Sequence, residues 1–229
     1  MKDYLSVLEK TRLFKNIEPS DLEKLINCLR GEVRKYESGT CIIALEQEVN
    51  HIGIVLEGQV EIVKENIAGD RNIIAMLEKS GMFAEGIVCT QKRLSPVTVR
   101  TKTKADVLMI PYEKIIITCG ESCTFHSLLI HNMLMLLGEK NYALNHKIDF
   151  LILKGMREKL ALYLLQEAKR NKSVAFNITL SRNDLAEYLN VSRSAMSREL
   201  SRMKEDGLID YYKNSFKIIN EEALKSFLR

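Results

Sequence analysis

The spacing of apolar residues along the chain changes from helical to strand-like and back to helical. Residues 18–30 have leucine and isoleucine at the spacing of an amphipathic helix, and Ser20 is suited to cap that helix. From about 33 to 112, short apolar runs rich in β-branched residues alternate with turns. No helix-length pattern interrupts these runs. Short strands at this spacing predict an antiparallel barrel or roll.

A long helical pattern follows, over about 122–153. Its apolar positions recur at alternating intervals of four and three residues, which is the a/d seam of a coiled coil. A helix packed on its own domain usually has a wider apolar stripe, so this narrow seam favours a parallel dimer of two such helices. Asn141 occupies one inner position, where it can pair with its twin and fix the register. The predicted dimer seam consists of Ile130, Leu134, Leu137, Asn141, Leu144, Ile148 and Leu151.

Two short helical patterns meet at a break in the C-terminal third. Ser181 and Asp184 resemble a capping box at the start of the first helix, and Ser192 is suited to cap the second. Asn190 lies at the turn, where tolerance of a left-handed backbone helps, and Gly207 ends the second helix. A solvated helical hairpin would explain the charges here, but not this close sequence of cap, turn and cap. The pattern therefore predicts a helix-turn-helix.

The second of these helices, expected over 193–205, is the predicted recognition helix. Its buried face would consist of Met196, Leu200 and Met203. Arginine and serine occupy the other face, and in helix-turn-helix proteins the first turns of this helix enter the DNA major groove. There Arg can bind guanine with two hydrogen bonds, and Ser can reach a phosphate or a base edge.

An amphipathic helix over 156–170 and a short β segment, VAFNITL, precede the helix-turn-helix. Residues 208–219 follow it and predict a β-hairpin that turns at Lys213-Asn214-Ser215. Helix-turn-helix plus hairpin is the winged variant, in which the lysines of the wing would contact phosphate. The candidate DNA-binding residues are Ser181, Arg182, Ser192, Arg193, Ser194, Ser197, Arg198, Arg202 and Lys213.

Charge supports this assignment, although weakly, because solvated helices are often mildly basic. Residues 154–229 contain 15 Lys and Arg against 10 Asp and Glu, whereas residues 1–153 contain 19 against 20. No apolar run approaches the ~20 residues that span a bilayer, and the N-terminus lacks the apolar stretch of a signal peptide. Five cysteines are an odd number. We therefore expect a cytoplasmic protein without a disulfide framework.

The order of these parts resembles the Crp/Fnr family of bacterial transcription regulators. The most specific match is SRNDLAEYLNVSRSAMSRELSRMKEDGLI, which follows the DNA-binding signature of the family. In the roll, GIVLEGQVEIVKE and SGMFAEG match the pattern around its glycine turns, and LFKNIEPSDLEKL matches its lead-in helix. The resemblance implies an α+β fold with an N-terminal antiparallel β-roll of the double-stranded β-helix or jelly-roll type. It further implies a sensor domain over 1–121, a dimerisation helix over 122–153 and a winged helix-turn-helix over 154–229.

The resemblance implies a cytoplasmic homodimer that binds a palindrome in double-stranded DNA, responds to an effector and works with RNA polymerase. One alternative is an effector-binding module that acts through protein contacts, without specific DNA binding. Another is an enzyme of the metal-dependent barrel type, but His51 is the only histidine within 33–112. The sequence has no glycine-rich phosphate loop, metal-hydrolase helix or nucleophile elbow, so we do not expect an enzyme.

The effector cannot be identified from the sequence. Glu85 matches the glutamate that holds the ribose in cyclic-nucleotide members of the family. Their phosphate-binding Arg-Ser pair aligns with Ser95-Pro96, which supplies no guanidinium and lacks one backbone N–H. Their adenine-contacting Thr-Ser aligns with Leu144-Asn145, so cAMP is not the expected effector. The candidate pocket residues are Gly81, Glu85, Gly86, Ser95, Leu144 and Asn145.

Two further family features bear on sensing and on the operator. Cys28 and Cys41 stand alone, so the N-terminal cysteine cluster of the iron–sulfur members is not supported. A separate set, Cys119, Cys123 and His126, would lie on one side of a helix and could bind metal or haem, or respond to oxidation. The simpler interpretation is that these side chains pack. Ser194 replaces a glutamate of the best-known member, so the half-site should differ.

Overall fold

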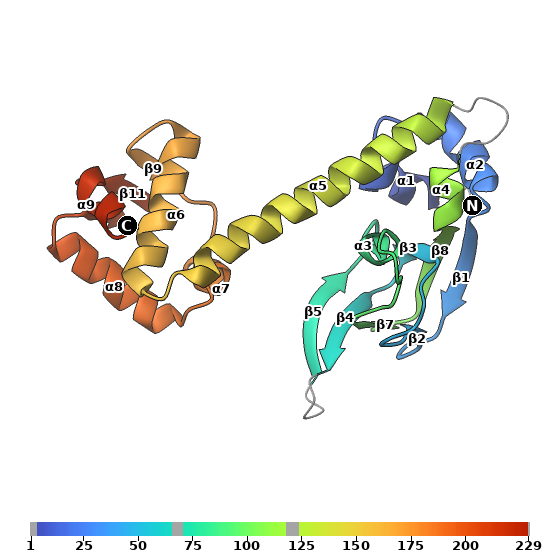
Figure 1. The fold of residues 1–229 in the computed structure, drawn as a ribbon, viewed down its shortest axis with the longest axis horizontal. Helices are drawn as coiled ribbons and strands as arrows, with labels where there is room; N and C mark the ends of the chain where they lie inside the picture. Colours follow the sequence, from blue (N-terminus) through green and yellow to red (C-terminus); the bar gives the residue numbers. More distant parts are fainter. Residues whose placement is uncertain (1–3, 66–70, 118–123, 229) are drawn as a thin grey trace. The chain divides into compact units, whose positions relative to one another are not determined.

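The computed structural model describes residues 4–65, 71–117 and 124–228. The chain divides into two compact units, residues 1–139 and 140–229, and each is described by itself (Figure 1). The long helix α5 (Thr124–Ile152) begins in the first unit and ends in the second. The predicted fold class is confirmed, because an antiparallel β-roll, a long helix and a winged helix-turn-helix follow one another.

Two four-stranded antiparallel sheets form the roll. The first has the order β1-β8-β3-β6, with β1 (Glu32–Tyr36), β8 (Ala105–Pro111), β3 (His51–Glu57) and β6 (Met82–Phe83). The second has the order β2-β7-β4-β5, with β2 (Cys41–Ile43), β7 (Thr98–Thr101), β4 (Val60–Glu65) and β5 (Arg71–Leu77). The inner strands β3 and β8 are apolar and buried along nearly their whole length, as strands covered on both faces should be.

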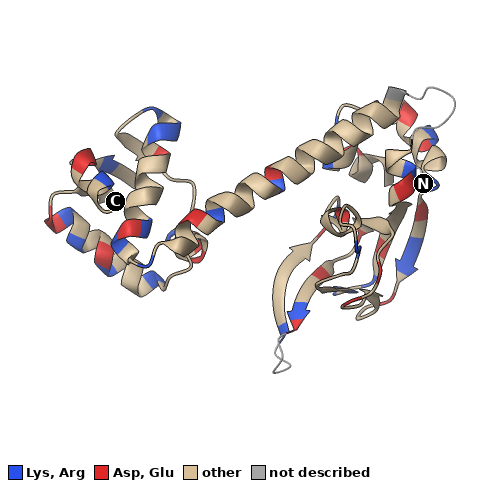
Figure 2. Cartoon of the chain, in the orientation of Figure 1, with Lys and Arg blue, Asp and Glu red and all other residues tan. Residues whose placement is uncertain are grey.

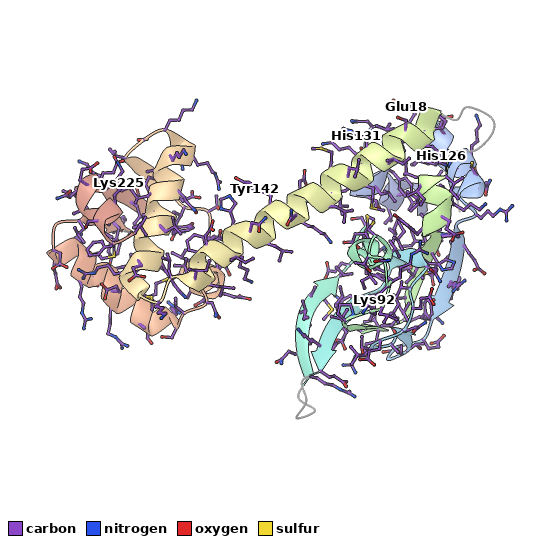
Figure 3. All side chains as sticks on the ribbon, viewed as in Figure 1. Glu18, Lys92, His126, His131, Tyr142 and Lys225 are labelled. Atoms are coloured by element: carbon purple, nitrogen blue, oxygen red, sulfur yellow. The ribbon has the colours of Figure 1, made fainter. Side chains whose placement is uncertain are left out.

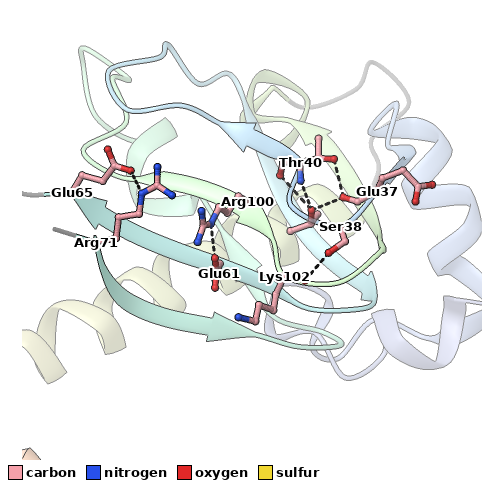
Figure 4. Close-up of polar contacts among 9 residues, drawn as sticks. Glu37, Ser38, Thr40, Glu61, Glu65, Arg71, Arg100 and Lys102 are labelled. Carbon is pink, nitrogen blue, oxygen red and sulfur yellow. Dashed lines mark hydrogen bonds and ion pairs between the residues drawn. The ribbon is translucent and has the colours of Figure 1, made fainter. Parts of the chain in front are cut away.

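The turn between β3 and β4 requires glycine. Gly58 has φ +80°, and a Cβ there would lie 2.1 Å from the carbonyl oxygen of Lys104. The neighbouring turns are joined by polar contacts, shown in Figure 4. The Ser38 hydroxyl donates to the carbonyl of Lys102 over 2.9 Å, and Arg100 pairs with the buried Glu61 across β7 and β4. These contacts fix the ends of the strands against each other.

Short helices precede the roll, interrupt it once and follow its last strand. They are α1 (Leu5–Leu8), the 3-10 turn η2 (Arg12–Phe14), α2 (Pro19–Cys28), α3 (Glu85–Val88) and α4 (Tyr112–Ile116). The buried amide of Asn132 on α5 donates to the carbonyls of Leu13 and Lys15, over 3.0 and 2.8 Å. One side chain therefore ties α5 to the N-terminal segment.

One expectation about this unit was wrong. Helix α2 begins after Glu18 and has no side-chain cap, so Ser20 does not cap it. Pro19 occupies the first helical position, where its fixed φ and missing N–H favour a helix start. The roll is interrupted by the four-residue helix α3, which is too short to show a helical pattern in the sequence.

The second unit contains α6 (Met156–Asn171), α7 (Arg182–Tyr188), α8 (Arg193–Glu205) and α9 (Glu221–Ser226). A three-stranded antiparallel sheet of order β10-β11-β9 completes it, with β10 (Ile209–Tyr212), β11 (Ser215–Ile218) and β9 (Ala175–Asn177). Side chains from α6, α7, α8 and the sheet meet in one core. The wing turn is Lys213-Asn214 alone, because Ser215 pairs with Tyr212 inside the hairpin, which corrects the longer turn that was expected.

The predicted caps of the helix-turn-helix are confirmed. Ser181 Oγ accepts from the Asp184 N–H, and the Asp184 carboxylate accepts from the Ser181 N–H, both over 3.2 Å. Ser192 Oγ accepts from the N–H of Ala195 over 3.3 Å. Asn190 in the turn has φ 53°, and Gly207 after α8 has φ 69°. Local contacts therefore fix where each helix begins and where the chain turns between them.

Candidate nucleic-acid interface

Helix α8 presents one buried and one exposed face. Met196, Leu200 and Met203 lie in the core, as the periodicity predicted. The opposite face is exposed and consists of Arg193, Ser194, Ser197, Arg198, Ser201 and Arg202. Within its first two turns, two arginines flank two serines, so this face carries hydrogen-bond donors and positive charge. Figure 2 colours the Lys and Arg positions of the second unit blue along the ribbon.

The arginines of the second unit differ in what they contact. Arg170 lies 3.1 Å from the carboxylate of Glu167, and Arg202 lies 3.6 Å from that of Glu199. Among the residues that the structure describes, Arg193 and Arg198 form no ion pair and no side-chain hydrogen bond. Their guanidinium groups are exposed and retain all their donors for an outside acceptor.

Two cations on α6 support α8 and the turn from inside the domain, and the sequence did not reveal either role. Arg157 Nε lies 2.5 Å from Glu199, and its Nη1 lies 2.8 Å from Asp206, so it joins the start of α6 to the end of α8. The hydrogen bond that Arg157 donates to Glu199 is the main reason why the Arg157 pKa is raised. The only signal for the second cation, Lys159, was its place on the apolar face of α6. Its buried ammonium donates to the carbonyl of Leu189, in the helix-turn-helix turn, over 3.2 Å.

Further cations lie on the wing or beside it. Lys213 is exposed, and its ammonium lies 5.4 Å from the ring centroid of Tyr212. Lys204 lies 2.6 Å from Asp210, and this hydrogen bond lowers the pKa of Asp210 and raises that of Lys204. Arg182, at the start of α7, is half-buried and donates to the carbonyl of Lys213 over 2.8 Å. Arg182 therefore differs in its surroundings from the exposed arginines of α8.

The candidate effector-pocket residues fall in both units. Gly81 directly precedes β6, and Glu85 and Gly86 begin α3, where Glu85 is buried and Gly86 is exposed. Ser95 is buried and donates its hydroxyl hydrogen to the carbonyl of Val97 over 2.7 Å. Its backbone N–H and carbonyl bond to Gln47 and Glu46, so its polar groups already have partners in the protein. Leu144 and Asn145 are exposed residues of the second unit.

The predicted dimer seam is largely open in the single chain. Ile130 and Leu137 are half-buried, whereas Asn141 is exposed. Four apolar side chains of the seam are each about half exposed or more: Leu134, Leu144, Ile148 and Leu151. From residue 138 to residue 149, every side chain of α5 except that of His146 is exposed.

The proposed cysteine and histidine set is only partly described. Cys119 and Cys123 lie outside the described residues. His126 is buried, and its Nε2 lies 3.1 Å from the carbonyl of Lys114 (Figure 3). Within the described ranges, no group of three His, Cys, Asp or Glu side chains could hold a metal ion. The described helices also include none with the length and apolar character needed to cross a membrane.

Two family models match separate parts of the chain. A cyclic nucleotide-binding domain matches residues 33–120, and a Crp-like helix-turn-helix domain matches residues 158–227. The chain belongs to the Crp/Fnr family. The two matches together support the assignment of this Crp/Fnr chain as a DNA-binding transcription regulator. No curated protein matches the sequence.

Solved structures share the fold of this Crp/Fnr chain at low sequence identity. The Catabolite Activator Protein of Thermus thermophilus is 18% identical, with 95% of this chain and 98% of that chain covered and a TM-score of 0.56. DNR from Pseudomonas aeruginosa is 17% identical, with 99% and 98% covered and a TM-score of 0.50. A transcriptional regulator from Thermotoga maritima is 22% identical, with 58% and 98% covered and a TM-score of 0.50.

Proposed function

We propose that this Crp/Fnr-family regulator is a homodimer that reads a palindromic operator through helix α8, under the control of an effector at its first unit. The observation that carries the proposal is the state of Arg193 and Arg198. Both are exposed at the start of the recognition helix and have no carboxylate partner in the described part of the chain. An arginine in this position can bind guanine with two hydrogen bonds.

The side chains between these arginines bear on the operator sequence. Ser194 and Ser197 are short and exposed, so each can reach a phosphate or a base edge without imposing a single base. Arg193 and Arg198 then supply most of the base readout. A half-site read in this way differs from one in which a glutamate at the position of Ser194 accepts a hydrogen bond from cytosine.

Dimerisation through α5 supports the palindromic site. Leu134, Leu144 and Leu151 lie on the seam and are exposed in the single chain. A second copy of the same helix, packed along the seam, would bury these apolar side chains. A two-fold dimer of helix-turn-helix units contacts two half-sites about 34 Å apart. Binding of an operator is therefore coupled to the seam, and RNA polymerase would be recruited to a DNA-bound dimer.

The effector in this proposal is a ligand other than cAMP. Glu85 matches the glutamate that holds the ribose in the cyclic-nucleotide members, so we expect the effector to present a hydroxyl group there. Ser95 bonds to Val97, Gln47 and Glu46, and Pro96 has no N–H, so this segment offers no cradle for a cyclic phosphate. That Leu144 and Asn145 contact the effector remains a prediction.

The test begins with genomic fragments retained by the purified protein, which define an operator. Arg198→Ala should cost about 1–3 kcal/mol of operator binding and relax the preference at one base position. Arg170→Ala is the matched control, because it removes the same charge from an exposed arginine that pairs with Glu167 on α6. It should leave operator affinity nearly unchanged. If Arg198→Ala binds like the wild type, the assignment of α8 is wrong, and if no fragment is retained, the protein acts through other contacts.

A further inference from the structure

Arg182 lies between the helix-turn-helix and the wing. It is the first residue of α7, and its guanidinium carbon lies 4.8 Å from the ring centroid of Phe216 and 5.2 Å from that of Tyr211. Its Nη2 donates to the carbonyl of Lys213 in the wing turn over 2.8 Å. Phe216 belongs to β11 and Tyr211 to β10, so one side chain of α7 contacts both strands and the turn of the wing.

The same ring cluster reaches the recognition helix. Tyr211 stacks on Phe216 with 5.5 Å between ring centroids, and its hydroxyl lies 3.3 Å from Ser201 Oγ on α8. The ammonium of Lys204, also on α8, lies 5.6 Å from the Tyr211 ring centroid. Tyr211 is therefore held between α7 and α8, and the wing position depends on both helices.

The guanidinium of Arg182 is directed into the protein. Its Nη1 is buried and has no hydrogen-bond partner among the described atoms, and burial lowers the pKa of the group. An arginine that binds a phosphate needs its N–H groups exposed at the surface. Arg193 and Arg198 have that exposure, whereas Arg182 has one N–H bonded to the wing turn and its guanidinium packed against the Tyr211 and Phe216 rings.

We propose that Arg182 is a positioning residue, which holds the wing turn so that Lys213 reaches the DNA, and that it does not contact the DNA itself. The proposal rests on the proposed function, because it assigns a role to the wing in operator binding. The turn has only two residues, Lys213 and Asn214, so the carbonyl that Arg182 holds belongs to the same residue as the contacting ammonium. Displacement of that carbonyl moves the ammonium with it.

A double-mutant cycle on the full-length protein tests this, with operator affinity measured at several salt concentrations. Lys213→Ala alone should weaken binding about tenfold and reduce the salt slope by about two, because the homodimer loses one phosphate contact in each subunit. Arg182→Met should do the same, because the lysine is displaced. The double variant should be no weaker than Arg182→Met alone, since both changes remove the same contact from each subunit.

Arg182→Lys separates position from charge. Lysine keeps the charge but lacks the planar fork that lies against the Tyr211 and Phe216 rings while it donates to the Lys213 carbonyl, so this variant should bind as weakly as Arg182→Met. Circular dichroism and thermal unfolding show whether the methionine variant folds. If it does not, Arg182→Lys replaces it in the double-mutant cycle with Lys213→Ala. Wild-type affinity in Arg182→Lys, additive losses in the double variant, or no loss in Lys213→Ala would each overturn the proposal. Failure of the wild type to retain any operator would instead refute the proposed function.

Discussion

Replacement of Leu144 and Leu151 by glutamate should convert the protein from a dimer to a monomer. Both residues lie on the seam of α5, one heptad apart, with 62% and 51% of their surface exposed in the single chain. Leu137 is a poorer site, because it packs against the core of the first unit, where a charge would disturb folding. Variants at Leu144 and Leu151 therefore report on association rather than on the fold of one chain.

The expected effect can be estimated from the exposed fractions. Burial of a whole leucine side chain contributes about 2 kcal/mol, so burial of the exposed half contributes about 1 kcal/mol. Two leucines in each of two subunits then contribute about 4 kcal/mol to association, which corresponds to a roughly thousandfold change in the dissociation constant. The cost of placing carboxylates against their symmetry mates adds to this loss.

Sedimentation velocity at micromolar concentration measures the change. The matched control is Met135→Glu with Tyr142→Glu, which adds the same two charges at the same spacing on another side of α5. Met135 and Tyr142 are 53% and 68% exposed, so the control changes similarly accessible side chains. Tyr142 is labelled on α5 in Figure 3. The control should remain dimeric. A dimeric seam variant, a monomeric control, or a wild type that is itself monomeric would refute the seam.

Two further predictions concern the effector and the aromatic cluster of the second unit. Calorimetry should detect no cAMP binding at physiological concentration, because Ser95 and Pro96 supply no guanidinium for the phosphate, and micromolar affinity would contradict this. Burial, with a smaller effect of Glu167, raises the pKa of Tyr163 from 10.0 to about 12. The folded state then keeps a proton that the unfolded state releases above pH 10.0, so stability should fall as the pH rises to about 12. The loss should be about 1–2 kcal/mol, less than the full shift would give, because solvent screens part of the effect. Denaturant titrations of Tyr163→Phe should show a smaller loss over this window, and an unchanged pH dependence would mean that other groups cause it.

The helix-turn-helix was predictable because its signals are local. Ser181 and Asp184 cap each other within one turn, and Asn190 adopts the left-handed conformation within the chain segment that needs it. The buried face of α8 followed from its period for the same reason. Strand β1 was not predicted, because its residues, EVRKY, are mostly polar and exposed, and its pairing with β8 joins residues far apart in sequence. Helix α3 has four residues, too few for any period.

The candidate site was predictable in outline, but not in the roles of individual cations. Arg198 and Arg202 look alike in the sequence, since both lie on the exposed face of α8. They differ because Glu199 pairs with Arg202 and also with Arg157, which comes from another helix. Lys159 resembles a surface lysine until the fold places it beneath the turn, where it donates to Leu189. Such roles depend on partners that only the tertiary structure brings together.

The open stretch of α5 over residues 138–149 links folding to assembly. It includes Gly138, Asn141 and Asn145, which are weak helix formers. All of its side chains except that of His146 are exposed, so packing against the remainder of the chain stabilises it little. A helix of this length has little stability of its own in water. In the proposed dimer, its coil-to-helix equilibrium and the monomer–dimer equilibrium are therefore one linked process. An effector that orders this stretch tightens the dimer, and by reciprocity the dimer binds that effector more tightly by the same factor.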